Sequence, residues 1–454
     1  MPVRPSLRPL PLLLTAVLAA TALSACGSDS GDDQNTVKIQ YKRSTDAKNK
    51  IFDRELESVK KEFEAKFPDK KVELIPLKVP DEQYYTKVQQ MIRSKKTAPD
   101  LVYEDTFLIN SDITAGLLTP LDDYLKDWAD WDKYIDTAKT AAQGQDGKVY
   151  GVPDGTDTRG LWYNKELFKQ AGLPEEWQPK TWDEVLGAAR TIKEKLPDVI
   201  PMNVYTGKAV GEAASMQGFE MLLYGTEDTL YDESAKKWVA GSQGFKDALQ
   251  FVETVYKEKL GPDPQDALDP NVGTKVATEW LPENKLAINL DGSWMSNNWQ
   301  ETGAKPWPEW TDVLGQTAMP TQNGQAPGRV SMSGGWTWAI PANAGNKDLA
   351  FEFMKVAQSQ KNCTRLTIAN GQIAVREDVA SDPDYQGYVP GIQFFTDLVA
   401  ATHYRPALPV YPQVSTAIQE AMEVVTTGDS SVDDAAKAYD EQLDSISKGE
   451  VVQK

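Results

Sequence analysis

The N-terminal part of the chain alternates between the hydrophobic periods of strands and of helices. Residues 36–41 (TVKIQY) alternate apolar and polar side chains as a strand does. Residues 52–67 carry large apolar side chains every three or four positions, which predicts an amphipathic helix that ends at Pro68. The same order recurs at 72–92, and another apolar strand follows at 100–103. Strands that alternate with helices predict an α/β fold with a mainly parallel sheet.

A strand followed by two helices is predicted at 157–185 (DTRGLWYNKELFKQAGLPEEWQPKTWDEV). Residues 161–163 are a compact apolar run of strand type. Asn164 is placed to cap the helix that follows, which a Gly-Leu-Pro sequence ends. Thr181 and Glu184 have the spacing of a capping box, so another helix is expected to begin there. The tryptophans of this stretch are assigned to the core or surface of these helices.

Chain length and composition indicate a soluble protein with two domains. At 454 residues the chain is too long for one ordinary core, and 40% hydrophobic with 25% charged residues is typical of globular proteins. The formal net charge of −19 argues against nucleic acid, which would be repelled, and against unaided binding to anionic lipid. The 13 Trp and 17 Tyr residues fit both large cores and faces that stack on sugar rings.

Residues 1–25 have the pattern of a secretory signal peptide. A basic start precedes an apolar run at 10–22 that is too short for a stable membrane span. The sequence LSAC at 23–26 resembles the lipobox of bacterial lipoproteins, which implies cleavage before Cys26 and a lipid on its sulfur. An ordinary signal peptide that ends near a cysteine is the alternative. Residues 26–35 then predict a flexible polar tether.

Most catalytic constellations are absent from the sequence. His403 is the single histidine, which excludes histidine-rich metal sites, and it is interpreted as a packed or surface residue. No GxSxG, GxxxxGK[ST], CxxC or GxGxxG motif occurs. With Cys26 lipidated, Cys363 has no disulfide partner and is expected to be buried. No catalytic residue, metal or cofactor is predicted, although 67 acidic residues leave the paired carboxylates of a glycoside hydrolase open.

Four motifs along the chain occur in a familiar order. They are YNKELF to KTWDEV at 163–185, ENKLAINLDGSW at 283–294, SGGWTWAIP at 333–341 and NGQIAVRED at 370–378. Together they resemble the signature of family 1 extracellular solute-binding proteins. These proteins are the sugar-capturing subunits of bacterial ATP-binding-cassette (ABC) importers, and maltose-binding protein is a relative. The sequence departs from the family pattern in having Asn284 in place of a glycine.

The resemblance implies a two-lobe α/β fold of the periplasmic-binding-protein type (type II), with mixed, mainly parallel sheets and a ligand cleft between the lobes. Residues 36–152 are expected to form the first part of lobe 1, and 153–312 to form lobe 2. Residues 313–454 are expected to return to lobe 1 and to end in hinge-crossing helices shared between the lobes. The turn-rich sequence before Asp157 fits the first hinge.

Ligand-binding candidates follow first from the predicted strands. Ligands of open α/β sheets bind beyond the carboxyl ends of strands. This rule selects Arg43 after the first strand, and Glu104 and Asp105 after the third. Carboxylates and guanidinium groups suit sugars because they form paired hydrogen bonds with hydroxyl groups.

Other candidates follow from the motifs. By position, the resemblance implies sugar contacts for Asp157 and Trp294, and a looser match implies one for Glu212. Trp336 follows two glycines that allow close approach, which makes it a second stacking candidate. Structural roles stay open for them: Asp157 as a hinge brace, and both tryptophans as packing residues. The remaining candidates are Arg376, Tyr404 and Arg405.

These observations predict a lipid-anchored extracellular protein that captures a mono- or oligosaccharide by hinge closure. The family resemblance implies delivery to ABC permease subunits, with a separate ATPase as the energy source, and a monomeric state. Contact with the membrane is expected only through the lipid, and no contact with nucleic acid is expected. A secreted glycoside hydrolase and a surface sugar receptor without transport are the alternatives. The sequence does not select one sugar.

Overall fold

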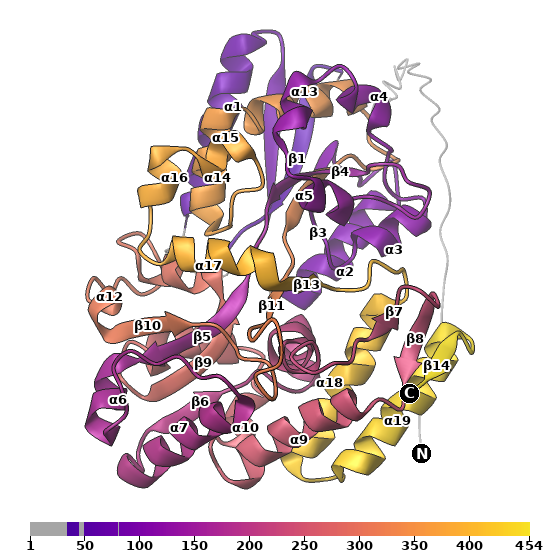
Figure 1. Cartoon of the computed structure of the whole chain (residues 1–454). Coiled ribbons are helices and arrows are strands. Elements are labelled where there is room, and N and C mark those ends of the chain that lie inside the picture. Colours follow the sequence, from indigo (N-terminus) through magenta and orange to yellow (C-terminus); the bar gives the residue numbers. More distant parts are fainter. Residues whose placement is uncertain (1–33, 45–49, 80) are drawn as a thin grey trace, which may run out of the picture. The chain divides into compact units, whose positions relative to one another are not determined.

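The computed structural model describes residues 34–44, 50–79 and 81–454 (Figure 1). Residues 34–454 form one compact unit. The predicted signal peptide, Cys26 and most of the predicted tether lie outside the described residues. Within the described part of the chain, no helix is long and apolar enough to cross a membrane.

A five-stranded sheet forms the centre of the part that we call the first lobe. Its strands lie in the order β2 (Lys71–Leu77), β1 (Thr36–Lys42), β3 (Leu101–Asp105), β12 (Trp336–Ala339) and β4 (Gly151–Gly155). β1 pairs in parallel with β2 and β3, whereas β12 is antiparallel to both of its neighbours. The strand and helix pattern of the N-terminal sequence is therefore confirmed for the first three strands.

Helices cover both faces of this sheet. Apolar side chains of α1 (Ile51–Lys66) and α13 (Lys347–Ala357) pack in one core, which includes Tyr103 of β3. Helices α2 (Asp81–Ile92) and α3 (Ile109–Thr114) pack in a second core, which includes the neighbouring Val102. Successive residues of β3 thus serve opposite faces of the sheet, as the period of a strand requires.

A four-stranded sheet forms the centre of the second lobe. Its order is β10 (Leu314–Thr317), β5 (Arg159–Asn164), β9 (Leu286–Gly292) and β6 (Ile200–Asn203). Only β6 and β9 are parallel here. The sequence predicted mainly parallel sheets. Both large sheets are instead mixed, and parallel pairs do not predominate in either. The chain passes from β4 to β5, and from β10 through β11 to β12, with no helix between the strands, so these connections lack the helical crossovers that keep strands parallel.

The signature stretch folds largely as its sequence predicts. Asn164 caps α6 (Lys165–Ala171) by accepting a bond from the Leu167 amide at 3.0 Å. Thr181 caps α7 (Trp182–Lys195) through the Glu184 amide at 3.3 Å. The Glu184 carboxylate accepts from the Lys180 amide at 2.7 Å, one residue before the expected capping-box donor. All three tryptophans of this stretch are buried in the core.

Two lobe boundaries lie at other residues than the sequence predicted. β4 stays in the first sheet through Gly155, so the chain leaves the first lobe at 156–158 and not at 153. β10 pairs with β5 from Leu314 to Thr317, so the chain is still in the second lobe at residues where the sequence analysis placed its return. The return occurs where β11 (Ser331–Ser333) leads into β12. Main-chain pairing decides these boundaries, and turn residues alone did not reveal it.

The C-terminal helices also differ from expectation. Helices α18 (Tyr411–Thr427) and α19 (Val432–Ser447) pack with α9 (Gln243–Lys257) in the core of the second lobe, and are not shared equally between the lobes. Before them, β13 (Thr402–Tyr404) pairs with β11. We call residues 156–158, 331–335 and 402–405 the crossing segments, because they run where the chain passes between the lobes.

The cap of α7 provides a test of the signature stretch. Thr181→Ala is expected to lower the free energy of unfolding by about 1 kcal/mol, because the Glu184 amide loses its acceptor. Thr181→Ser keeps a hydroxyl and should retain most of the stability. Urea unfolding measures both variants. An equal loss in the Ser and Ala variants would show that the hydroxyl does not stabilise the helix.

Candidate ligand-binding site

A pocket in the first lobe lies where the crossing segments meet β12. The volume accessible to the centres of water molecules is about 10 Å³, roughly the space of one water molecule. A sugar ring therefore enters only when lining groups move. The lining is mostly apolar, with hydroxyl groups from several threonines. The lining residues are Thr106, Ile135, Thr137, Ala138, Ala141, Pro153, Gly155, Thr156, Gly334, Trp336, Thr337, Val375 and Tyr404.

Two of the sequence-predicted residues, Trp336 and Tyr404, line this pocket. Trp336 is half-buried, and its ring stacks on Tyr103 with centroids 4.8 Å apart. Tyr84 meets the same indole edge-on at 5.6 Å, and the Lys42 ammonium lies 5.1 Å from its centroid. Tyr404 is 38% exposed, so its ring remains accessible. Aromatic rings beside hydroxyl groups suit the apolar faces and the hydroxyls of a sugar.

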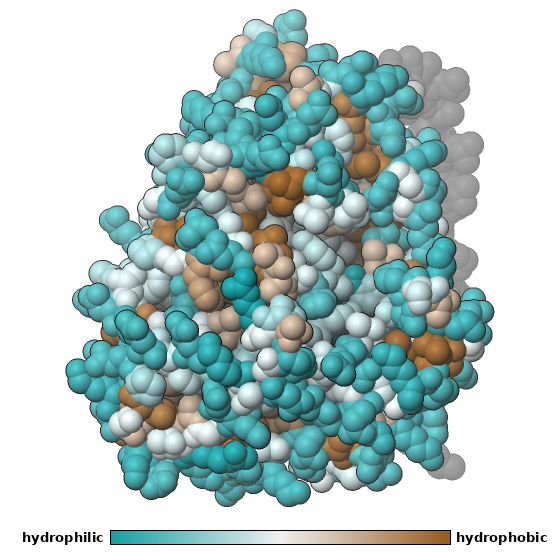
Figure 2. All heavy atoms as spheres, viewed as in Figure 1, coloured by the Kyte–Doolittle hydropathy of each residue, from teal (hydrophilic) through white to brown (hydrophobic). Residues whose placement is uncertain are grey.

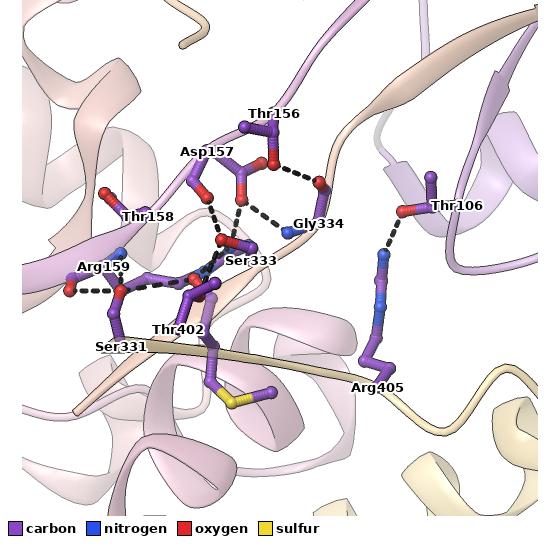
Figure 3. A network of polar contacts seen from close by, with 12 residues as sticks. Thr106, Thr156, Asp157, Thr158, Arg159, Ser331, Ser333, Gly334, Thr402 and Arg405 are labelled. Atoms are coloured by element: carbon purple, nitrogen blue, oxygen red, sulfur yellow. Dashed lines mark hydrogen bonds and ion pairs between the residues drawn. The ribbon is translucent and has the colours of Figure 1, made fainter. Parts of the chain in front are cut away.

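Asp157 braces two crossing segments against each other (Figure 3). Its carboxylate accepts a bond from the Gly334 amide at 2.8 Å and forms an ion pair with Arg159. Its carbonyl accepts from the Ser333 hydroxyl at 2.6 Å, and the Thr156 hydroxyl donates to the Gly334 carbonyl at 2.8 Å. The structure thus gives Asp157 the bracing role that the sequence left open. A ligand contact at this carboxylate stays a prediction.

A second polar cluster brings together three predicted residues, Asp105, Glu212 and Arg405. The Arg405 guanidinium donates to the Thr106 hydroxyl at 2.5 Å (Figure 3). It also donates to Asp105 at 3.4 Å and forms an ion pair with Glu212. The Tyr85 hydroxyl oxygen lies within hydrogen-bond distance of both carboxylates, 3.0 Å from Asp105 and 3.2 Å from Glu212, and its single proton serves one of them at a time. Because Thr106 also lines the pocket, the cluster and the pocket adjoin.

Trp294 lies apart from the residues that line the pocket. It belongs to η5 (Ser293–Trp299) and is half-buried. The Arg159 guanidinium lies 4.8 Å from the centroid of its ring. Trp294 is therefore connected to the Asp157 brace through Arg159, and its predicted contact with sugar stays a prediction.

Glu104 does not join the site, contrary to the strand-end prediction. Its side chain is 2% exposed and interacts with Asp112 of α3, because adjacent strand residues point to opposite faces. Burial and the nearby Asp112 carboxylate hold the pKa of Glu104 well above its usual range. A protonated Glu104 can donate to the Asp112 carboxylate, and the nearby Arg93 cation also favours the charged form of Asp112.

Arg43 and Arg376 are also engaged elsewhere. Arg43 forms an ion pair with Asp53 of α1 at 2.8 Å. Arg376 is 1% exposed, and its guanidinium forms a bidentate pair with Asp378 at 2.7 and 2.9 Å. The structure therefore gives both arginines bracing roles inside the first lobe. The strand-end rule and the motif selected these two positions, but they did not reveal the direction of the side chains.

Sequence reasoning missed Tyr85 and Thr106. Thr106 directly follows the predicted Asp105, so the same strand-end rule could have included it. Tyr85 lies in α2, far along the chain from Glu212, and carried no local signal. The two other packing predictions are confirmed: Cys363 is buried and free, and His403 is packed with its ring 4.8 Å from that of Tyr224.

A buried acid lies behind the site in the second lobe. Glu220 ends η3 (Ala213–Glu220), a π-helix that begins directly after Glu212. Burial raises the pKa of Glu220 to about 8, against a hydrogen bond from the Tyr411 hydroxyl, which lowers it. Tyr411 in turn packs edge-on against Phe107, 5.8 Å away, which follows the cluster residue Thr106. π-Helical turns occur often at functional sites.

Two lobes joined by crossing segments, with a polar cluster and a pocket where they meet, define a binding protein of the periplasmic two-lobe class. The sequence profile described as bacterial extracellular solute-binding protein matches residues 45–362, which is more than half of the chain. The chain therefore belongs to this family.

Relatives cover nearly the whole chain. A putative binding protein of Brucella abortus is 25% identical over 96% of this chain and 98% of its own length. The diacetylchitobiose binding protein DasA of Streptomyces coelicolor is 26% identical over 80% of each chain. An ABC transporter solute-binding protein of Thermotoga lettingae, solved with α-D-tagatose, superposes with a TM-score of 0.76 at 24% identity. That match covers 91% of this chain and 99% of the other, and it confirms the predicted type II fold.

The pKa of Glu220 provides a test of the electrostatics. The folded protein holds this proton up to about pH 8, whereas the unfolded chain releases it near 4.5. The free energy of unfolding should therefore fall across this window, by up to about 1.4 kcal/mol per pH unit. Glu220→Gln lacks this contribution, so the stability difference, wild type minus variant, should decrease from pH 4.5 to 8. Urea unfolding across the window measures it, and a constant difference would contradict the assignment.

Proposed function

We propose that this protein captures a mono- or oligosaccharide outside the cytoplasmic membrane and delivers it to the permease of an ABC importer. The observation that carries the proposal is the position of Trp336 in a mostly apolar pocket with threonine hydroxyls, which adjoins the Asp105–Arg405–Glu212 cluster. An aromatic face and charged hydrogen-bonding groups are the two requirements of a sugar site. The names of two similar proteins mention diacetylchitobiose and α-D-tagatose as ligands, which supports the same ligand class.

Capture would use the two lobes as a hinge. Groups from both lobes contribute to the cluster, so a sugar that bonds to both shifts the population toward a closed arrangement. The closed protein would then dock on the permease pair, and a separate ATPase would supply the energy. No group of three or more His, Cys, Asp or Glu side chains in the described ranges is arranged to hold a metal ion. Binding in this proposal needs no cofactor and no catalytic residue, and the protein acts as a monomer.

A panel of mono- and oligosaccharides in a thermal-shift screen tests the ligand class. A sugar that binds with micromolar affinity should raise the stability by about 4 kcal/mol at millimolar concentration. Trp336→Ala should weaken the binding of any such sugar at least about tenfold, because the stacking face is lost. Calorimetry measures the affinity.

Trp307→Ala is the matched control, since this half-buried tryptophan packs on Trp299 and does not line the pocket. Equal weakening in both tryptophan variants would contradict the assignment of the pocket. The absence of a thermal shift with every sugar of the panel, or the release of cleaved sugar after long incubation, would overturn the proposed function.

Anchoring through Cys26 has a separate test. The full-length chain should incorporate a labelled palmitate and sediment with membranes when it is expressed in a bacterial host. Cys26→Ser should release the protein, because a single lipidated residue is the proposed attachment. Cys363→Ser is the control, and it should leave labelling unchanged since Cys363 is buried. Labelling that persists in Cys26→Ser would refute the anchor.

A further inference from the structure

Arg405 lies on a crossing segment and contacts both lobes through buried charges. On the first-lobe side it bonds to Asp105 and Thr106, which end and follow β3. On the second-lobe side it pairs with Glu212, the residue before η3. The side chains of all three charged residues are at most 15% exposed. These contacts are therefore shielded from water and are screened little by salt.

The rest of the cluster repeats this connection. The hydroxyl of Tyr85, in the first lobe, lies within hydrogen-bond distance of both carboxylates that Arg405 pairs with, so a second group connects Asp105 and Glu212. Gly334 leaves the space that the guanidinium needs, since a Cβ atom there would lie 3.1 Å from Arg405 Nη2. Removing the guanidinium would leave the buried Asp105 and Glu212 carboxylates without the cation that pairs with both, which is unfavourable.

We infer that Arg405 is an internal tie that holds the two lobes together through Asp105 and Glu212 before any ligand arrives. This inference rests on the proposed function only in treating lobe closure as the binding event. The pocket of about 10 Å³ adjoins the tie through Thr106, which lines the pocket and accepts a bond from Arg405. Hydroxyl groups of an incoming sugar would then exchange with this ion pair. The tie therefore sets the closed population of the unliganded protein.

The distance between the lobes in the unliganded protein tests this tie. The chain beginning at Gly27 contains every described residue and lacks Cys26. Spin labels at Lys61→Cys on α1 and Glu176→Cys between α6 and α7 occupy exposed positions, one in each lobe, whereas Cys363 is buried and stays unlabelled. Pulsed electron paramagnetic resonance then reports the distribution of distances without a ligand.

Arg405→Met should shift the ratio of long to short distances about tenfold toward the long ones, as loss of a charge-assisted contact implies. Glu212→Gln removes the partner from the other lobe and should produce a shift in the same direction. Arg190→Met is the matched control, because it breaks a bidentate pair with Glu258 inside the second lobe. It should leave the distribution as in the wild type.

An unchanged distribution in both Arg405→Met and Glu212→Gln would overturn the tie. If Arg405→Met does not fold, as judged by circular dichroism, Glu212→Gln decides the question. If both variants show longer distances and the wild type binds no sugar of the panel, the tie is supported and the ligand class is refuted. If both variants show unchanged distances and the wild type binds a sugar, the tie is refuted and the proposed function is retained.

Discussion

The brace that Asp157 forms between two crossing segments determines where the other groups of the site lie. Its carboxylate holds the Gly334 amide at 2.8 Å and pairs with Arg159, so the chain that leaves the first lobe is fixed to the chain that returns to it. At Gly335 the returning chain passes so close to the Gly155 carbonyl that a Cβ atom would lie 2.4 Å from it. Only glycine permits this approach. The brace therefore places Trp336 at the start of β12, beside Asp105.

From this fixed start, the remaining chemistry follows from strand geometry. β12 pairs with β3 so that Trp336 and Asp105 are cross-strand neighbours, and Thr106 continues from the end of β3. Arg405 arrives from a third crossing segment and neutralises the acids at this edge. Hydrophilic side chains cover most of the molecular face in Figure 2, and hydrophobic ones form only small patches on it. The pocket, which Thr106 and Trp336 both line, adjoins these acids.

Local features of the fold could be predicted from the sequence, and non-local ones could not. The helix caps at Asn164 and Thr181 could be predicted because each cap depends on a residue only three positions away. Asp105 was found by the strand-end rule, but the same rule chose Glu104, which points to the opposite face. The lobe boundary at β10 depends on pairing with β5, about 150 residues earlier. Tyr85 lies at the site because of how α2 packs on the sheet, and no local sequence pattern encodes this packing.

We propose that a carbohydrate binds where Trp336 and the Asp105–Arg405–Glu212 cluster adjoin. The decisive measurement is a crystal structure with the sugar that gives the largest thermal shift. A sugar ring is expected against Trp336 or Tyr404, with hydroxyl groups bonded to at least one member of the cluster. A sugar bound away from both, for example on Trp294 alone, would contradict it.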